Sequence, residues 1–268
     1  MNLLSFVSLI AFFVFLITGV YVFLDNYRSR IHKAFLFLNL SFAVYSLAYT
    51  FFYLVPTREF ALTWFRVSSV GWTLFPAILL NFALALTGEG KKLNDTIIQP
   101  LIFLPGMVFL IRSLIYRLYI DDFIWVGTFW KFIPDFSSVW LWMFLFYLTI
   151  YVLFSFLLIL RWQNNSRLHK SRILGSIILW LVVFGYSASL VSNFVLPALQ
   201  IQNIPEFTHL ACSIVFVGFG FGIIKYRHKP LTSDSAGEPI FSAMHDMVFL
   251  TDEDFNILRT NKSLTETT

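Results

Sequence analysis

Long apolar stretches alternate with short polar gaps over the first 224 residues of the chain. Each stretch has the roughly 20 residues that a helix needs to cross a bilayer core of about 30 Å. Only helices and closed barrels satisfy their backbone groups in lipid, and barrel strands would show about ten residues of alternating polarity. The pattern therefore predicts transmembrane helices. The seven predicted spans are residues 3–24, 34–55, 63–87, 97–117, 139–160, 173–196 and 207–224.

Basic residues gather in every second gap between these spans. Twelve lysines and arginines lie in four segments, 25–33, 88–96, 161–172 and 225–229. The other gaps hold only Arg58 and Lys131. Because cytoplasmic loops carry an excess of Lys and Arg, the N-terminus is predicted to lie outside and the C-terminus in the cytoplasm. We expect an all-α, multi-pass protein of the plasma membrane, with the lipid bilayer as a partner.

The composition agrees with a membrane protein. Hydrophobic residues make up 58% of the chain and charged residues 13%, whereas a soluble domain carries about 25% charged residues. The net charge of +4 comes from short basic loops, and no basic stripe with interleaved aromatics predicts nucleic-acid binding. The single cysteine, Cys212, lies in an apolar span, so neither a disulfide framework nor a metal site of paired cysteines is expected. We expect no cofactor and no metal.

The gap at 118–138 is long, aromatic and on the predicted external side. Five acidic residues lie on that side: Glu59, Asp121, Asp122, Asp135 and Glu206. One interpretation is an interfacial aromatic belt with its acids in water. The other is an external lid over a ligand pocket between the helices.

Polar residues within the spans are candidates for function, because they are costly in lipid. Five of them, with Arg117 at the end of its span, fall in the predicted outer half, and four of these form a candidate ligand-binding set: Arg66, Arg112, Asn193 and His209. The alternative is that each side chain reaches the headgroups independently.

Other residues within the spans predict structure rather than function. Asn39 and Asn81 lie nearer the predicted inner side, where interhelical hydrogen bonding is the expected role. Pro76, Pro100 and Pro105 fall inside spans and are expected to kink or break the helices locally.

The sequence lacks the residues that several known functions of membrane proteins require. None of the spans carries a mid-membrane lysine for a retinal Schiff base, and no intramembrane protease motif or phosphate-binding loop is present. His245 is followed by Asp246 but lacks the proline expected of a kinase phosphoacceptor, and no catalytic residue is predicted. A small-solute transporter or channel stays an alternative, although no internal repeat is visible. Flux in proteoliposomes would distinguish it from a sensor.

The composition changes after the last span. Residues 230–239 are polar and contain Pro, Gly and Ser, which indicates a cytoplasmic linker. Residues 240–268 predict a helix end, a strand at 247–251, an acidic turn, a second strand at 256–260 and the start of a helix. This order resembles the opening of a PAS sensory domain, through Met244, Asp246, residues 248–252, Ile257 and Asn261. A segment of this size is too short to close a core.

Residues 1–229 resemble the seven-helix N-terminal sensor region of many bacterial histidine kinases. The resemblance rests on N-out topology, the aromatic loop 118–138, the basic loop 161–172 leading into ILGSIILWLVVFG, the segment LPALQIQNIPE at 196–206 and a basic exit from the last span. It implies that the bundle senses an unidentified small-molecule or membrane signal and relays it to cytoplasmic PAS and kinase modules. It also implies a homodimer.

The same resemblance sets the expected domain organisation. Residues 1–229 are expected to form the sensor domain, 230–239 the linker and 240–268 the N-terminal part of a PAS-like domain. Because neither a phosphoacceptor helix nor an ATP-binding domain is present, we expect the sequence to be part of a longer kinase or the product of a truncated gene. The sensor region of a diguanylate cyclase and a purely structural membrane anchor are the remaining alternatives.

Overall fold

The computed structural model describes residues 2–89, 95–116, 120–166, 169–226, 249–251 and 257–260. These belong to two compact units, Met1–Tyr226 and Arg227–Thr268. In the second unit, β3 (Phe249–Thr251) pairs antiparallel with β4 (Ile257–Thr260), so strands occur at both places where the sequence predicts them. The helices expected on either side lie outside the described residues. The assignment of this unit to a PAS domain stays a prediction.

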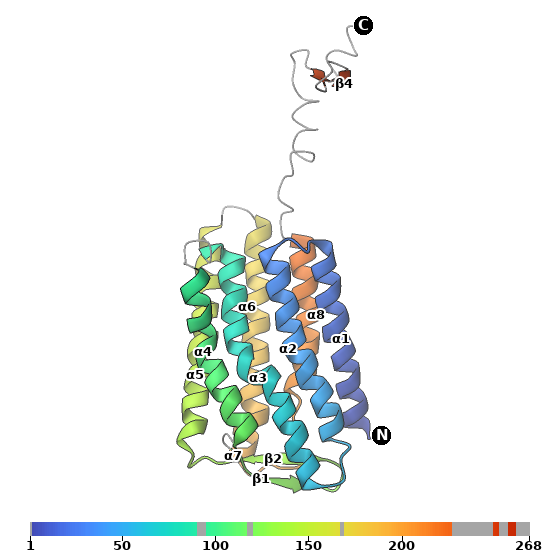
Figure 1. Ribbon diagram of the computed structural model, residues 1–268, viewed down its shortest axis with the longest axis vertical. Coiled ribbons are helices and arrows are strands. Elements are labelled where there is room, and N and C mark those ends of the chain that lie inside the picture. The colour runs from blue at the N-terminus through green and yellow to red at the C-terminus, as the bar shows by residue number, and fades with distance from the viewer. Residues whose placement is uncertain are drawn as a thin grey trace. The chain divides into compact units, whose positions relative to one another are not determined.

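The first unit is a bundle of long apolar helices, as the sequence predicts (Figure 1). Seven helices among the described residues are long and apolar enough to cross a membrane. They are α1 (Leu3–Asp25), α2 (Arg30–Phe52), α3 (Arg58–Thr87), α4 (Asp95–Ile115), α5 (Val139–Asn165), α6 (His169–Leu190, extended by the π-helical segment η2, Val191–Val195, and by α7, Leu196–Ala198) and α8 (Thr208–Tyr226).

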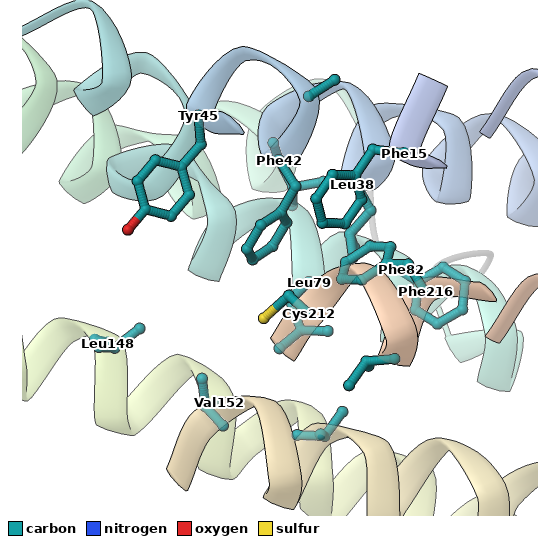
Figure 2. Close-up of a cluster of buried hydrophobic side chains, with 14 of the residues drawn as sticks. Phe15, Leu38, Phe42, Tyr45, Leu79, Phe82, Leu148, Val152, Cys212 and Phe216 are labelled. Carbon is teal, nitrogen blue, oxygen red and sulfur yellow. The ribbon is translucent and has the colours of Figure 1, made fainter. Parts of the chain in front are cut away.

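Six of these helices close a ring through pairwise contacts, in the order α1, α2, α3, α5, α6 and α8. The fourth helix, α4, packs against α3. Small residues permit the closest approaches, as expected for helices that associate in lipid. At Gly71 of α3, a Cβ atom would overlap the backbone carbonyl oxygen of Ser41 on α2. The ring encloses a core rich in phenylalanine, drawn for Phe15, Phe42 and Phe216 in Figure 2.

The sequence predicts that prolines within the spans kink or break their helices. Helices α3 and α4 are not broken at Pro76, Pro100 or Pro105. The Tyr147 hydroxyl of α5 donates to the Thr73 carbonyl at 3.2 Å, three residues before Pro76. The Tyr151 hydroxyl donates to the Ile102 carbonyl at 3.1 Å, three residues before Pro105. A proline leaves carbonyls in the preceding turn short of a donor, and neighbouring helices can supply one. The tyrosines of α5 fulfil this role here.

Asn39 and Asn81, the two asparagines near the predicted inner side, have different hydrogen-bond partners. Asn81 of α3 accepts a hydrogen bond from Gln99 of α4 at 2.9 Å, so the predicted interhelical role is confirmed for this residue. Asn39 donates to the Phe35 carbonyl of its own helix at 2.9 Å. For Asn39 the interhelical prediction is therefore wrong, because a carbonyl one turn back lies within reach of its short side chain.

A β-hairpin at one end of the bundle was not expected from the sequence. Strand β1 (Ile120–Trp125) pairs antiparallel with β2 (Trp130–Pro134), and Gly127 takes a positive φ of 77° in the turn. The hairpin buries Phe123, Phe129 and Phe132. These three rings contact Phe52, Tyr53 and Phe65 at the ends of α2 and α3, whereas Trp125 of the same hairpin is 50% exposed.

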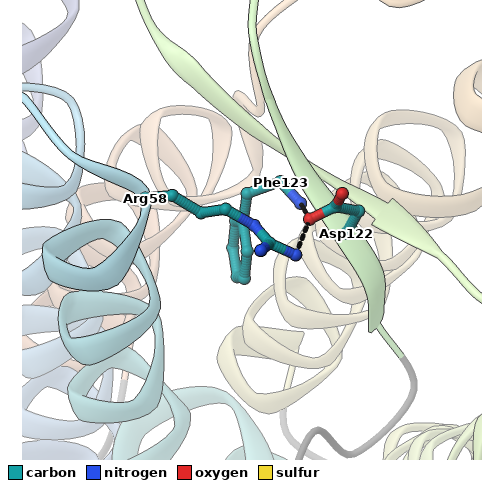
Figure 3. A network of polar contacts seen from close by, with 3 residues as sticks. All are labelled: Arg58, Asp122 and Phe123. Carbon is teal, nitrogen blue, oxygen red and sulfur yellow. Dashed lines mark hydrogen bonds and ion pairs between the residues drawn. The ribbon is translucent and has the colours of Figure 1, made fainter.

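Polar contacts hold this hairpin on the bundle. Arg58, the first residue of α3, pairs with Asp122 of β1, whose carboxylate also accepts from the Phe123 amide (Figure 3). The Trp130 indole donates to the Val55 carbonyl at 2.8 Å. Asn2, the N-cap of α1, donates to the Thr128 carbonyl in the hairpin turn at 2.9 Å. We call this end of the bundle the hairpin end.

Candidate functional site

A pocket runs from the hairpin end into the middle of the bundle. The space between its lining residues that no atom fills is about 920 Å³, open solvent at its mouth included. Its lining spans Phe65 to Leu79 on α3, which is roughly 20 Å at a rise of 1.5 Å per residue. The other walls come from α2, β2, α5, α6, η2, α8 and the α7–α8 loop. Through Phe132, the hairpin forms part of the wall.

Glu206 of the α7–α8 loop brings a carboxyl group to this pocket. Its side chain is only 3% exposed. The Tyr49 hydroxyl of α2 donates to Oε2 of Glu206, and the Tyr53 hydroxyl donates to the Glu206 backbone carbonyl at 3.1 Å. Oε1 has no hydrogen-bond partner among the described residues. Because Tyr45, Tyr49 and Tyr53 are spaced four apart on α2, their rings share one face of the helix and lie in contact.

The α7–α8 loop is fastened to the hairpin by a buried lysine. Lys131 of β2 is 2% exposed, and its ammonium donates to the Ile201 carbonyl at 3.0 Å and the Ile204 carbonyl at 2.9 Å. The turn into the loop places Gln200 at a φ of 59°, and the Ile201 amide donates to the Leu196 carbonyl at 2.9 Å. A left-handed residue with such a bond is a common helix C-cap. The chain thereby reverses and presents Glu206 to the bundle.

The π-helical segment η2 provides the polar groups opposite this loop. Asn193 donates to the Thr208 hydroxyl at 3.0 Å, and the Ser192 hydroxyl accepts from the Phe207 amide at 3.2 Å. Single π-helical turns inside helices are frequent at functional sites. Here the turn lies just before Pro197 and brings Asn193 to the pocket, where its Oδ1 has no described partner.

Burial decides the charge state of the loop. It raises the pKa of Glu206 to about 8, against opposing effects of the Tyr49 hydrogen bond and the Lys131 charge. Burial also lowers the pKa of Lys131, while the nearby Glu206 raises it. At neutral pH most Glu206 side chains are therefore protonated, and a cation beside Oε1 would favour the ionised form.

The four residues predicted to bind ligand do not all reach the pocket. Asn193 lines it, whereas Arg66, Arg112 and His209 are not among the described lining residues. The Arg112 guanidinium lies 4.4 Å from the ring centre of Tyr116 and 4.8 Å from that of Trp140.

Arg66 is partly buried on α3, and its Nε lacks a described partner. His209 is fully buried, with Nε2 at 2.8 Å from the Ser8 hydroxyl of α1 and its ring against Tyr45 and Tyr49. It thus packs behind two residues that line the pocket. Arg117 lies outside the described residues. Ligand binding by the four-residue set stays a prediction.

From the sequence alone, Glu206 is one of five acids on the predicted external side, and Lys131 is one of two basic residues in the external gaps. Two features of the sequence point to Glu206 and its tyrosine partners, and neither singles out Lys131. Glu206 directly follows Pro205 in the most motif-like segment of the chain, and the three tyrosines of α2 repeat at a helical spacing. Neither signal reveals that α2 and the α7–α8 loop meet, since they are about 150 residues apart in the sequence.

Comparison with known families settles the membership of the bundle. Residues 7–231 match the family described as the N-terminal 7TM region of histidine kinase. The chain belongs to this family. No curated protein matches the sequence.

The 7TM region serves as a membrane sensor, in agreement with its seven apolar helices. It is a multi-pass protein of the plasma membrane, as the sequence predicted. The candidate site of this 7TM region is the long pocket with the buried carboxyl group of Glu206.

Proposed function

We propose that this 7TM region is the sensing part of a two-component histidine kinase, which detects a small molecule in the pocket and relays its presence to cytoplasmic PAS and kinase modules. The observation that carries the proposal is the position of α8. Thr208, Val215, Phe216 and Phe219 of this helix line the pocket. The same helix ends at Tyr226, and the second unit begins at the following residue of the chain, Arg227.

The relay needs two arrangements of the bundle that bind the signal with different affinity. Contacts that occupancy would change are present on α8. Phe216 and Phe219 lie on the pocket, and Phe219 is stacked on Phe82 of α3 at 6.0 Å between ring centres. A molecule entering between α3 and α8 would compete with these contacts. The resulting displacement of α8 would reach the second unit directly along the chain.

The basic gaps of the sequence support an external position for the hairpin end. The pocket would then receive its signal from outside or from the outer leaflet, and α8 would carry it inward. A purely structural anchor would have no use for a buried carboxyl with an unpartnered oxygen, because such a group destabilises the fold.

Filling the pocket from within tests the relay without knowledge of the ligand. Gly185 of α6 lines the pocket, so Gly185→Phe would occupy part of it. Val183 of the same helix is 42% exposed on the bundle surface, which makes Val183→Phe a matched control. The readout is the distance between spin labels at Arg28→Cys and Lys225→Cys in a Cys212→Ala background, measured in nanodiscs.

We expect Gly185→Phe to shift the distance distribution and Val183→Phe to leave it at the value of the parent protein. If both variants fold and neither changes the distance, the pocket is not coupled to α8 and the proposed relay is wrong.

A further inference from the structure

The pocket is built mostly of aromatic rings around a single ionisable carboxyl group. Half of its 24 lining residues are aromatic: Phe42, Tyr45, Tyr49, Phe65, Trp72, Phe75, Phe132, Phe144, Tyr186, Phe194, Phe216 and Phe219. Glu206 is the one formally charged residue among the described lining residues. Such a wall favours an apolar or aromatic body and offers one site for a polar group.

The carboxyl group of Glu206 is half satisfied. Oε2 accepts from Tyr49, whereas Oε1 is buried without a described partner. A buried acceptor in this state costs free energy that a donor from a ligand would recover. The Tyr49 hydroxyl and the Tyr53 bond to the backbone hold the group in place, so little ordering is required when a ligand binds.

No cation among the described residues occupies this position. The Lys131 ammonium is close enough to influence Glu206 electrostatically, but it donates to the carbonyls of Ile201 and Ile204 and is not among the lining residues. Arg66 and Arg112 are likewise not among the described lining residues. An anionic ligand would meet the carboxyl group, and no cation among the described lining residues would compensate.

Taking the proposed sensing function as its premise, we propose that the pocket binds a small aromatic or apolar amine, with the protonated amine on Oε1 of Glu206 and the body among the aromatic rings. The ammonium group supplies the donor that Oε1 lacks and pairs its charge with the carboxylate. The rings of Tyr45 and Tyr49, which contact each other and line the same pocket, would attract a cation further. A neutral alcohol could donate one hydrogen bond to Oε1, but it would gain neither the charge pairing with the carboxylate nor the attraction of the aromatic rings for a cation.

Release of the Glu206 carboxyl proton on binding would distinguish an amine from a neutral ligand. Burial holds the pKa of Glu206 at about 8, so the group is mostly protonated at pH 7 before binding. An ammonium ion beside it stabilises the carboxylate, and the carboxyl proton leaves to the buffer. Binding at pH 7 should release roughly one proton per amine.

The test uses the whole chain in nanodiscs and two matched molecules, 2-phenylethylamine and 2-phenylethanol. Titration calorimetry in two buffers of different ionisation enthalpy gives the affinity and the number of protons released. We expect saturable amine binding with proton release and at least tenfold weaker binding of the alcohol. Glu206→Gln should weaken amine binding at least tenfold, whereas Glu59→Gln, an exposed acid of the same charge, should leave it unchanged.

Gly185→Phe provides a second variant that does not touch Glu206 and should block amine binding by filling the pocket. Equal affinity for amine and alcohol, an unchanged affinity in Glu206→Gln, or only non-saturable partitioning of both molecules would overturn the proposal. These results leave the relay itself untouched, since that is tested by the effect of Gly185→Phe on α8. Saturable amine binding without movement of α8 would instead overturn the relay and leave the binding site in place.

Discussion

The Tyr49 hydroxyl of α2 donates a hydrogen bond to the carboxyl group of Glu206, 157 residues further along the chain. This bond joins the second helix to the loop between α7 and α8. It fixes a buried carboxyl group at the hairpin end of the pocket. Predictions about stability, pH dependence and signalling follow from this arrangement.

Stability should fall as the pH rises through the neutral range. The pKa of Glu206 in the folded protein is about 8, above its ordinary value of 4.5. Between these values the folded state holds a proton that the unfolded state has lost. The free energy of unfolding therefore decreases with pH by up to about 1.4 kcal/mol per unit. Thermal unfolding in detergent between pH 5 and 8 should show this decrease.

Glu206→Gln should flatten this pH profile, because the amide resembles the protonated carboxyl group and does not titrate. Glu59→Gln serves as the control and should retain the parent profile. An unchanged pH profile in Glu206→Gln would show that another group is responsible.

Lys131→Met should destabilise the hairpin end. The substitution keeps most of the apolar stem but removes the bonds to the Ile201 and Ile204 carbonyls, which leaves two acceptors without their donor. We expect a loss of about 2 kcal/mol or more in unfolding free energy. The exposed Lys170→Met should have no measurable effect. Equal stability of the two variants would contradict a fastening role for Lys131.

Loss of the Lys131 charge should also raise the pKa of Glu206, since this charge lowers it. In Lys131→Met, the decrease of stability with pH should extend to higher pH than in the parent protein. Thermal unfolding between pH 7 and 9 would reveal the displacement.

Gly71→Ala should disrupt the contact between α2 and α3. The added methyl group would overlap the Ser41 carbonyl oxygen, and backbone cannot move aside as a side chain can. Overpacking of this kind costs about 1–3 kcal/mol. Gly218→Ala is the matched control, because its methyl group would lie 3.3 Å from the flexible Leu181 side chain. Comparable thermal stability of the two variants would argue against a tight α2–α3 contact.

The orientation of the bundle can be tested by thiol labelling in intact cells. In a Cys212→Ala background, Thr128→Cys lies in the hairpin turn and Lys170→Cys at the start of α6. A membrane-impermeant maleimide should label Thr128→Cys in intact cells and Lys170→Cys only after permeabilisation. The reverse result would place the hairpin end in the cytoplasm.

Helices are predictable from this sequence because a lipid environment imposes a strong local pattern. The predicted spans 3–24 and 139–160 match α1 and most of α5, because length and hydropathy alone identify a transmembrane helix. The hairpin was not predicted because no regular alternation of apolar and polar residues marks its strands. Phe123, Phe129 and Phe132 are buried by contacts with other parts of the fold.

The site was only partly predictable for the same reason. Asn193 could be found as a polar residue within an apolar span. Glu206 lies between spans, where an acid appears unremarkable, and its burial depends on Tyr49, Tyr53 and Lys131 from distant elements. Only the folded arrangement shows that this carboxyl group is buried and that one of its oxygens has no partner among the described residues.

One measurement joins the pocket to the relay. The distance between spin labels at Arg28→Cys and Lys225→Cys, in the Cys212→Ala background, is followed while 2-phenylethylamine is titrated into the nanodisc-embedded protein. We predict a shift that saturates with the midpoint of amine binding and is absent in Glu206→Gln. Saturable binding of the amine with no change in the distance between the two labels would contradict coupling of the pocket to α8.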